Sequence, residues 1–250
     1  MPVPILLELD RVSKRFGQVV IADDLSLTLE AGSTLGVVGP NGAGKSTLFG
    51  MVSGDVAPGS GEVRFAGRSL HRVDAAARCR LGIGRTYQVP RPFVGMTVFE
   101  NTLVAAQQGG RLHRQAATDR VLDVLSETGL LASANTPAGR LGLLARKRLE
   151  VARALATGPK LLLLDEVAGG LTEPEVVELV GIIRAVNARG VAVVWIEHVV
   201  RALLSTVDRL ICLAGGAVIG DGRPEDVLAL PQVRQIYLGS AGSGPGGPEL

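Results

Sequence analysis

A short apolar run that leads into a glycine-rich loop is the feature that most constrains the fold of this chain. Leu35-Gly36-Val37-Val38 is continuously apolar, which is expected of a strand buried on both faces of a sheet. The run continues directly into Gly39, and the pattern predicts a helix from about Lys45. A buried strand, a glycine-rich turn and a helix in immediate succession predict one unit of a parallel α/β sheet.

The loop between this strand and this helix fits the pattern G-x-x-x-x-G-K-[ST], and a chance match of a glycine-rich turn is the weaker interpretation in this context. Glycines let the backbone approach phosphates closely, while the amide groups and the helix N-terminus supply positive potential. Lys45 is predicted to reach the β- and γ-phosphates of ATP, and Ser46 to ligate Mg²⁺. The predicted nucleotide-binding residues of the loop are Gly39, Pro40, Asn41, Gly42, Ala43, Gly44, Lys45, Ser46 and Thr47.

A second apolar strand ends in two acidic residues. Leu161 to Leu164 is followed directly by Asp165 and Glu166, and ligands of open α/β sheets bind at the carboxyl ends of the strands. Asp165 is therefore predicted to hold Mg²⁺, and Glu166 to polarise the water that attacks the γ-phosphate. By itself, an acidic pair after a strand is as often a helix cap as a metal or catalytic site. The pair predicts such a site here because the glycine-rich loop occurs in the same chain.

The order of the remaining patterns predicts one domain over residues 1–238. Residues 5–67 read mainly as alternating strands, which predicts an antiparallel β lobe, and a helical lobe is predicted at about residues 90–157. A strand at 191–196 completes a strand–helix–strand unit, which predicts a mainly parallel sheet. Residues 239–250 are rich in Gly, Ser and Pro and are predicted to be a flexible tail.

Local signals place the predicted helices. Their caps, apolar faces and breakers are characteristic of helix boundaries. The signals are Asp74 as a cap, a capping box of Thr97 and Glu100, an apolar face at Val121, Leu122 and Leu125 that ends at Gly129, a helix from Arg146 to Ala156, another opened by Pro174 and closed by Gly190, a hairpin at Gly215-Gly216, and a last helix from Pro224.

Composition excludes several classes of protein. With 46% hydrophobic and 20% charged residues, the chain is predicted to be compact, yet its apolar runs fall far short of the about 18 residues that span a bilayer. The N-terminus lacks the features of a secretory signal, which predicts a cytoplasmic protein. A net charge of +2 with scattered basic residues predicts no nucleic-acid partner, and Cys79 and Cys212 are predicted to be free thiols.

Further residues distinguish among the proteins that contain such a loop, and the absence of an Asn-Lys-x-Asp motif disfavours a GTPase. Over about residues 5–239 the chain resembles the ABC ATPase family. The resemblance implies that Gln88, in Arg-Thr-Tyr-Gln, senses Mg²⁺ and water and contacts membrane subunits. It also implies that His198, in Trp-Ile-Glu-His, contacts the γ-phosphate, and that Phe16 stacks on adenine. Gln88, Glu166 and His198 are thus the predicted catalytic residues, and Ser46, Gln88 and Asp165 the predicted metal site.

The resemblance is strongest to the ATPase subunits of branched-chain amino acid importers. It is carried by residues 85–93, residues 96–101 and the ending Tyr237-Leu238-Gly239. It implies an α/β fold in which a P-loop NTPase core with a mainly parallel sheet bears an antiparallel β lobe and an inserted helical lobe. The implied partners are a second ATPase subunit, two transmembrane permease subunits and an extracytoplasmic solute-binding protein, which would place the chain peripherally at the cytoplasmic face of the inner membrane.

The chain departs from the family pattern in two places. The signature Leu-Ser-Gly-Gly-Gln, which the family places before the helix predicted from Arg146, reads Leu141-Gly142-Leu143-Leu144-Ala145, and Gly169-Gly170-Leu171-Thr172 replaces a loop that usually ends in Asp. Thr172 is predicted to cap the following helix instead. Both segments would contact a second ATPase subunit, so an asymmetric pair is predicted, with a homodimer as the alternative. A weakly hydrolysing regulatory subunit and a non-transport ABC ATPase are the rival functions.

Overall fold

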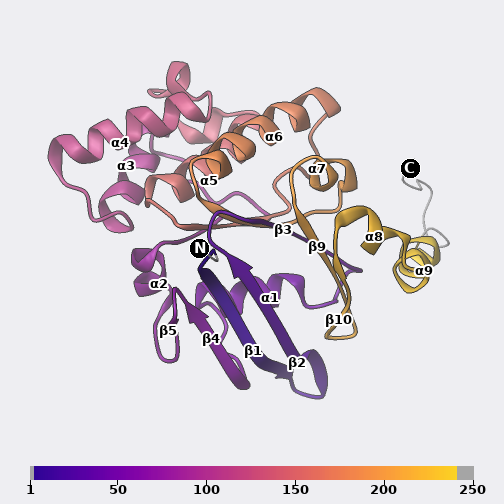
Figure 1. The fold of residues 1–250 in the computed structure, drawn as a ribbon. Coiled ribbons are helices and arrows are strands. Elements are labelled where there is room, and N and C mark those ends of the chain that lie inside the picture. The colour runs from indigo at the N-terminus through magenta and orange to yellow at the C-terminus, as the bar shows by residue number, and fades with distance from the viewer. Residues whose placement is uncertain (1–2, 241–250) are drawn as a thin grey trace.

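The computed structural model describes residues 3–240, and these residues form two sheets with an adjoining group of helices (Figure 1). The strands are β1 (Ile5–Phe16), β2 (Val19–Glu30), β3 (Thr34–Val38), β4 (Ser60–Phe65), β5 (Arg68–Ser69), β6 (Ile83–Arg85), β7 (Leu161–Asp165), β8 (Ala192–Ile196), β9 (Arg209–Ala214) and β10 (Ala217–Gly222). The helices are α1 (Lys45–Ser53), α2 (Ala75–Leu81), α3 (Val98–Gln108), α4 (Arg114–Glu127), α5 (Leu143–Ala156), α6 (Glu173–Ala188), α7 (Val200–Leu204), α8 (Pro224–Ala229) and α9 (Pro231–Ser240), with 3-10 turns at Leu131–Ser133 and Ala138–Arg140.

The larger sheet has the strand order β10-β9-β3-β8-β7-β6. The strands from β9 to β6 pair in parallel, and only β10 runs antiparallel to its neighbour. The smaller sheet, β2-β1-β4-β5, is antiparallel throughout. The predicted α/β fold with an antiparallel β lobe is therefore confirmed, and β6 is a short strand that the sequence patterns did not reveal.

The central strands are buried on both faces, as their continuous apolar runs predicted. Alternate residues of β7 belong to two different cores: Leu161 and Leu163 pack with α1 and the antiparallel sheet, whereas Leu162 and Leu164 pack with the helices on the other side. Because neighbouring side chains of a strand point to opposite faces, each face needs its own apolar partner layer. Figure 1 shows these two layers below and above the parallel strands.

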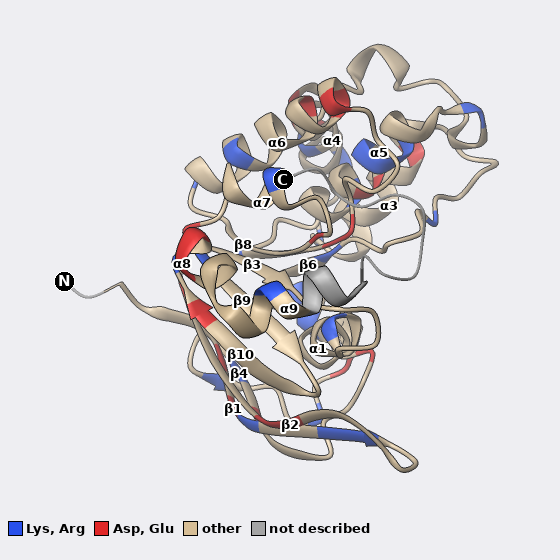
Figure 2. Cartoon of the chain, turned by 90° about the vertical axis from the view of Figure 1, so that its right-hand side faces the viewer, with Lys and Arg blue, Asp and Glu red and all other residues tan. Residues whose placement is uncertain are grey.

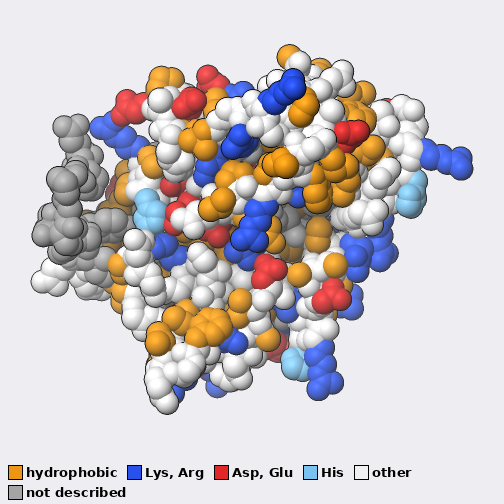
Figure 3. Space-filling view, turned by 180° about the vertical axis from the view of Figure 1, so that it is seen from behind, with side chains coloured by type: hydrophobic (Ala, Val, Ile, Leu, Met, Phe, Trp, Pro, Cys, Tyr) orange, Lys and Arg blue, Asp and Glu red, His pale blue; other side chains and the backbone are white. Residues whose placement is uncertain are grey.

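Helices α3, α4 and α5 form the helical lobe that the sequence predicted, at the upper left of Figure 1. Figure 3 shows apolar side chains gathered over this part of the molecule, at the upper right of that view. The capping box of α3 is confirmed, because Glu100 accepts a hydrogen bond from the Thr97 backbone at 2.8 Å and donates its own N–H to the Thr97 hydroxyl. The N-cap at Asp74 is likewise confirmed by its bond from Ala77 N at 2.7 Å.

Leu122 does not belong to the buried face of α4, contrary to prediction. The buried residues of this helix are Ala117, Val121, Val124 and Leu125, and the Leu122 side chain is 42% exposed. Spacings of three and four residues from Val121 reach Val124 and Leu125 on one helix face, whereas Leu122 is rotated away from that face.

Two predicted helix boundaries are also corrected. Helix α5 begins at Leu143 rather than Arg146, with Gly142 as its N-cap, so much of the altered signature lies inside the helix. Helix α8 begins at Pro224 as predicted but is not the last helix, because α9 extends from Pro231 to Ser240. The flexible tail predicted from residue 239 is corrected at its start, because residues 239 and 240 belong to α9; residues 241–250 lie outside the described residues.

Acidic and basic side chains are interspersed over both sheets and the helices (Figure 2). Within residues 3–240, no helix is both long enough and apolar enough to cross a membrane.

The burial of α4 gives a matched stability test. We expect Leu125→Ala to lower the free energy of unfolding by about 2–5 kcal/mol, because it leaves a cavity in the core, and Leu122→Ala to lower it by less than about 1 kcal/mol. Urea unfolding followed by circular dichroism measures both values. Equal losses in the two variants would contradict the orientation of α4.

Candidate functional site

The glycine-rich loop lies between the carboxyl end of β3 and the N-terminus of α1. Gly44 is the N-cap of α1 with a φ of 97°, and a Cβ at this position would lie 2.4 Å from the Ile21 carbonyl oxygen. Gly39 has a φ of 147°, and a Cβ there would lie 2.1 Å from the Leu213 carbonyl oxygen. The loop thus requires glycine at both ends, because it is clamped between β2 and β9 in a conformation that side chains disfavour.

Lys45 is buried in the cradle that this loop forms. Its ammonium group donates to the carbonyl oxygens of Gly39 at 2.7 Å and Pro40 at 3.0 Å. Burial lowers the pKa of the Lys45 amine, while the carboxylates of Glu166 and Asp165 act in the opposite direction. The predicted phosphate-binding lysine and the predicted acidic pair therefore share one electrostatic environment.

Three residues that the sequence placed far apart meet at Glu166. Its carboxylate accepts a hydrogen bond from the Gln88 side-chain amide, and its other oxygen lies 2.9 Å from His198 Nε2. Glu166 follows β7, His198 follows β8 by two residues, and Gln88 follows β6 by three. Since these strands are parallel neighbours, their carboxyl ends bring the three side chains to one edge of the sheet.

Asp165 is a buried acid of this edge, 3% exposed, with one side-chain oxygen paired and the other without a partner in the described part of the chain. Oδ2 lies 3.3 Å from the Arg85 guanidinium, while Oδ1 has no hydrogen-bond partner among the described residues. Burial raises the pKa of the Asp165 carboxyl, and Arg85 opposes that effect. A buried carboxylate oxygen without a partner, close to Lys45, fits a Mg²⁺ ligand, because Mg²⁺ in nucleotide sites is held by one or two carboxylates together with phosphate oxygens and waters.

Three charged residues that the sequence analysis did not single out support the site, and two of them, Lys147 and Glu197, are buried. Arg85 bridges Asp165 and Asp55, Lys147 donates to the Glu166 carbonyl oxygen, and the Glu197 carboxylate accepts from the backbone amides of Ala168 and His198. Lys147 carried a sequence signal, since it stands on the buried face of α5, four residues before Val151. A charged residue on an apolar helix face requires a polar partner in the interior.

Phe16 lies at the end of β1, and its ring is 50% exposed with the Lys14 ammonium 5.1 Å from the ring centre. The Lys14 amine also donates to the Ala57 carbonyl oxygen at 2.7 Å. This contact anchors the strand end near the turn after α1. A partly exposed aromatic ring can stack on an adenine base, and the adenine role of Phe16 stays a prediction.

The altered signature presents an apolar surface. Leu143 is the first residue of α5 and its side chain is 47% exposed, while Leu141 is buried and Gly142 is the N-cap. The loop from Gly169 to Thr172 leads into α6, and the predicted capping role of Thr172 is confirmed by its backbone bond to the Glu175 carboxylate at 2.8 Å.

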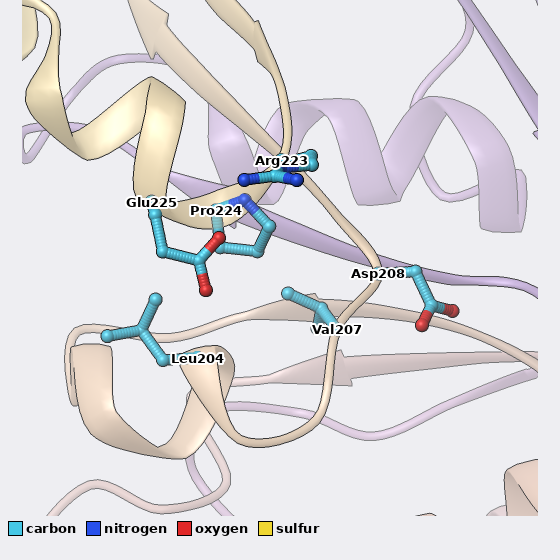
Figure 4. A pocket seen from close by; sticks show the side chains of 6 residues that line it. All are labelled: Leu204, Val207, Asp208, Arg223, Pro224 and Glu225. Atoms are coloured by element: carbon cyan, nitrogen blue, oxygen red, sulfur yellow. The ribbon is translucent and has the colours of Figure 1, made fainter.

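A cavity of about 370 Å³ lies elsewhere, between α7 and α8 (Figure 4). One of its lining residues, Asp208, binds the Thr34 hydroxyl at 2.6 Å. Thr34 begins β3, whereas the glycine-rich loop follows the other end of that strand, so this cavity belongs to the opposite edge of the sheet from the candidate site.

The fold and this geometry define a P-loop nucleotide-binding protein. The profile of the family described as ABC transporter matches residues 22–169. A LivG branched-chain amino acid transport ATP-binding protein of Salmonella typhimurium is 34% identical, with 94% of this chain and 98% of the relative covered. The LptB lipopolysaccharide export ATP-binding protein of Acidithiobacillus ferridurans is 35% identical, with 94% and 97% covered. The chain belongs to the ABC transporter family and is the ATP-binding and ATP-hydrolysing subunit of a transporter.

Solved structures agree with this assignment. A nucleotide-free ATP-binding cassette from an ABC transporter superposes with a TM-score of 0.87 at 27% identity, covering 93% of this chain and 98% of that one. A cassette in its ADP conformation superposes with a TM-score of 0.86 at the same identity, covering 94% and 99%.

The Arg85–Asp165 pair generates a prediction about stability and pH. We expect Arg85→Met to lower the free energy of unfolding by roughly 3 kcal/mol at pH 8, because it leaves a buried carboxylate without its cation. The pKa of Asp165 already lies above its ordinary value of 3.8, and loss of Arg85 raises it further. The folded protein then retains a proton that the unfolded chain releases, so its stability falls as the pH rises through the folded pKa.

The difference in free energy of unfolding between the wild type and Arg85→Met should therefore be smaller at pH 5 than at pH 8, as measured by urea unfolding. Asp165→Asn serves as the matched background, because the amide keeps the shape and removes the charge. In that background Arg85→Met should cost much less. The same loss with Asp and with Asn at position 165 would show that the charge pair is not the cause.

Proposed function

We propose that Glu166 is the catalytic carboxylate that polarises the water attacking the γ-phosphate of ATP. The observation that carries this proposal is the position of its carboxylate between Gln88 and His198, beside the P-loop lysine. A carboxylate oriented by two side chains suits the positioning of a water molecule and the acceptance of its proton. Gln88 then orients the water, and His198 contacts the γ-phosphate.

The other predicted residues bind different parts of ATP and its metal ion. Lys45 and the backbone N–H groups of residues 39 and 41–47 hold the phosphates, Pro40 having no N–H to donate, and Phe16 stacks on adenine. Ser46 and Asp165 would hold Mg²⁺, with Gln88 close by. When bound, Mg²⁺ neutralises charge on the β- and γ-phosphate oxygens. The partnerless Oδ1 of Asp165 supports this metal role.

We further propose that the chain powers an importer for branched-chain amino acids or related small polar solutes. The relatives named for branched-chain amino acid transport, LivG and the BraF protein of Pseudomonas aeruginosa, support this at 34% and 32% identity over 94% of the chain. The alternative is export, which the equally similar lipopolysaccharide export relative favours. In either direction the chain would act with two transmembrane permease subunits, at the cytoplasmic face of the membrane, and an importer would also use a solute-binding protein.

The altered signature favours a second, different ATPase subunit as the partner. In a closed pair, residues 141–145 would face the nucleotide of the other subunit, where Leu143 and Leu144 offer no hydroxyl or amide side chain to phosphate. The P-loop and the acidic edge of this chain keep their polar residues. A partner with an intact signature would therefore complete the ATP site of this chain, whereas this chain would complete the partner's site poorly.

Glu166→Gln tests the catalytic and pairing proposals together. We expect kcat for ATP hydrolysis to fall by about 100- to 10,000-fold, while ATP binding measured by calorimetry stays within about threefold. Size-exclusion chromatography with light scattering should show this variant as a monomer with Mg²⁺ and ATP, and as a dimer only when the partner ATPase is added. Undiminished turnover would remove the role of Glu166, and ATP-driven dimerisation of the chain alone would favour a homodimer.

The direction and substrate need a transport assay. The chain, co-purified with its permease subunits, is reconstituted in liposomes, and we expect ATP-dependent uptake of radiolabelled leucine, isoleucine or valine that requires the solute-binding protein. Replacing Lys45 by Met provides the inactive control. ATPase activity stimulated by lipopolysaccharide, with no amino acid transport, would overturn the importer proposal.

A further inference from the structure

Lys147 places a positive charge in the interior, directly behind the candidate catalytic residue. Its side chain comes from the first half of α5 and the residue is 5% exposed. The amine donates to two backbone carbonyl oxygens, that of Glu166 at 2.9 Å and that of Gln88 at 3.2 Å. Lys147 therefore holds the main chain of two predicted catalytic residues at once.

The surroundings of Lys147 compensate for the burial of its charge. Burial lowers the pKa of the amine, and four carboxylates oppose this effect, with Glu197 first among them and then Glu166, Asp165 and Glu150. A buried lysine costs free energy unless it is paired and hydrogen-bonded. The two carbonyl oxygens and these carboxylates supply that pairing, so the groups that Lys147 holds account for its burial.

The backbone of Glu166 has an unfavourable conformation that neighbouring groups must hold in place. Glu166 adopts a φ of 48°, a left-handed conformation that residues other than glycine rarely occupy and that persists only where neighbours enforce it. Its N–H donates to the Ile196 carbonyl oxygen at 2.9 Å, and its carbonyl oxygen accepts from Lys147. These two bonds fix the peptide units on either side of Glu166, and with them the direction of its carboxylate.

Helix α5 also holds the segment that carries Gln88. The buried Glu150, three residues after Lys147, accepts a hydrogen bond from the Arg91 backbone at 2.8 Å, and Arg153 donates to the Arg91 carbonyl oxygen at 2.8 Å. Among the hydrogen bonds of the described residues, only that of Lys147 connects α5 with Glu166. Lys147 is thus the residue of α5 that contacts Glu166 directly, and it does so at the main chain.

We propose that Lys147 is a positioning residue for ATP hydrolysis: it fixes the left-handed backbone of Glu166 and couples the catalytic carboxylate to the helical lobe. This inference rests on the proposed catalytic role of Glu166. Lys147 does not act on ATP itself, since both of its hydrogen bonds go to main-chain carbonyls. A movement of α5 relative to the parallel sheet would displace the main chain of Glu166 and of Gln88 together. The rate of hydrolysis would then depend on the position of the helical lobe.

The test compares Lys147→Met, which keeps the length and loses the donors, with Lys147→Arg, which keeps a donor. Hydrogen exchange is measured for a peptide covering 166–171 in the nucleotide-free protein. We expect exchange about tenfold faster in Lys147→Met, as for the loss of a charge-assisted hydrogen bond, and near wild type in Lys147→Arg. In ATPase assays kcat should fall about 10- to 100-fold in Lys147→Met with KM within about twofold, and Lys147→Arg should recover most of kcat.

Arg148→Met is the matched control, because it removes a neighbouring cation of the same helix. The partner of Arg148 is Glu178 of α6, not the candidate site. It should leave both the exchange of residues 166–171 and kcat near wild type. Unchanged exchange in Lys147→Met, or an equal change in Arg148→Met, would overturn the proposal. Full turnover by Glu166→Gln would instead refute the catalytic role of Glu166, while the exchange measurement would still decide whether Lys147 holds this loop.

Discussion

The parallel pairing of β6, β7, β8 and β3 is the constraint on which the rest of the structure depends. Parallel strands share one carboxyl edge, so the residues that follow each strand collect there whatever their separation in the chain. Gln88, Glu166, His198 and the P-loop each begin within three residues of the end of one of these strands. The helices and the antiparallel sheet bury the two faces that such strands leave apolar, and the polar chemistry is confined to the edge.

Several acidic residues lie close together at that edge, and three cations compensate for the repulsion among them. Asp165 and Glu166 are adjacent, and Glu197 lies buried nearby. Lys45, Arg85 and Lys147 approach them from the P-loop, from β6 and from α5. Because each cation comes from a different element, the charge balance also ties those elements together. In this site the same contacts that stabilise the fold orient the candidate catalytic groups.

Much of the site was predictable because its residues follow recognisable strand patterns. The P-loop, the pair Asp165 and Glu166, and the helical lobe were each read from local sequence. The burial of Leu122 was predicted wrongly, because a single apolar residue does not fix the rotation of a helix. The start of α5 was also predicted wrongly, because residues 143–145 were assigned to a loop by comparison with the family signature and not from a local helix signal. The short strand β6 is too brief to leave a periodic signal.

The sequence by itself determined the buried strands, the glycine-rich loop and the residue types of the predicted phosphate site, because these depend on local periodicity and on backbone conformations that only certain residues adopt. Tertiary structure decided the contacts among residues distant in the chain: the Glu166 carboxylate between Gln88 and His198, the pairing of Arg85 with Asp165, and the Lys147 amine on two carbonyl oxygens. Such contacts depend on how strands pair and helices pack, and no local pattern encodes which carbonyl a lysine on a helix will reach.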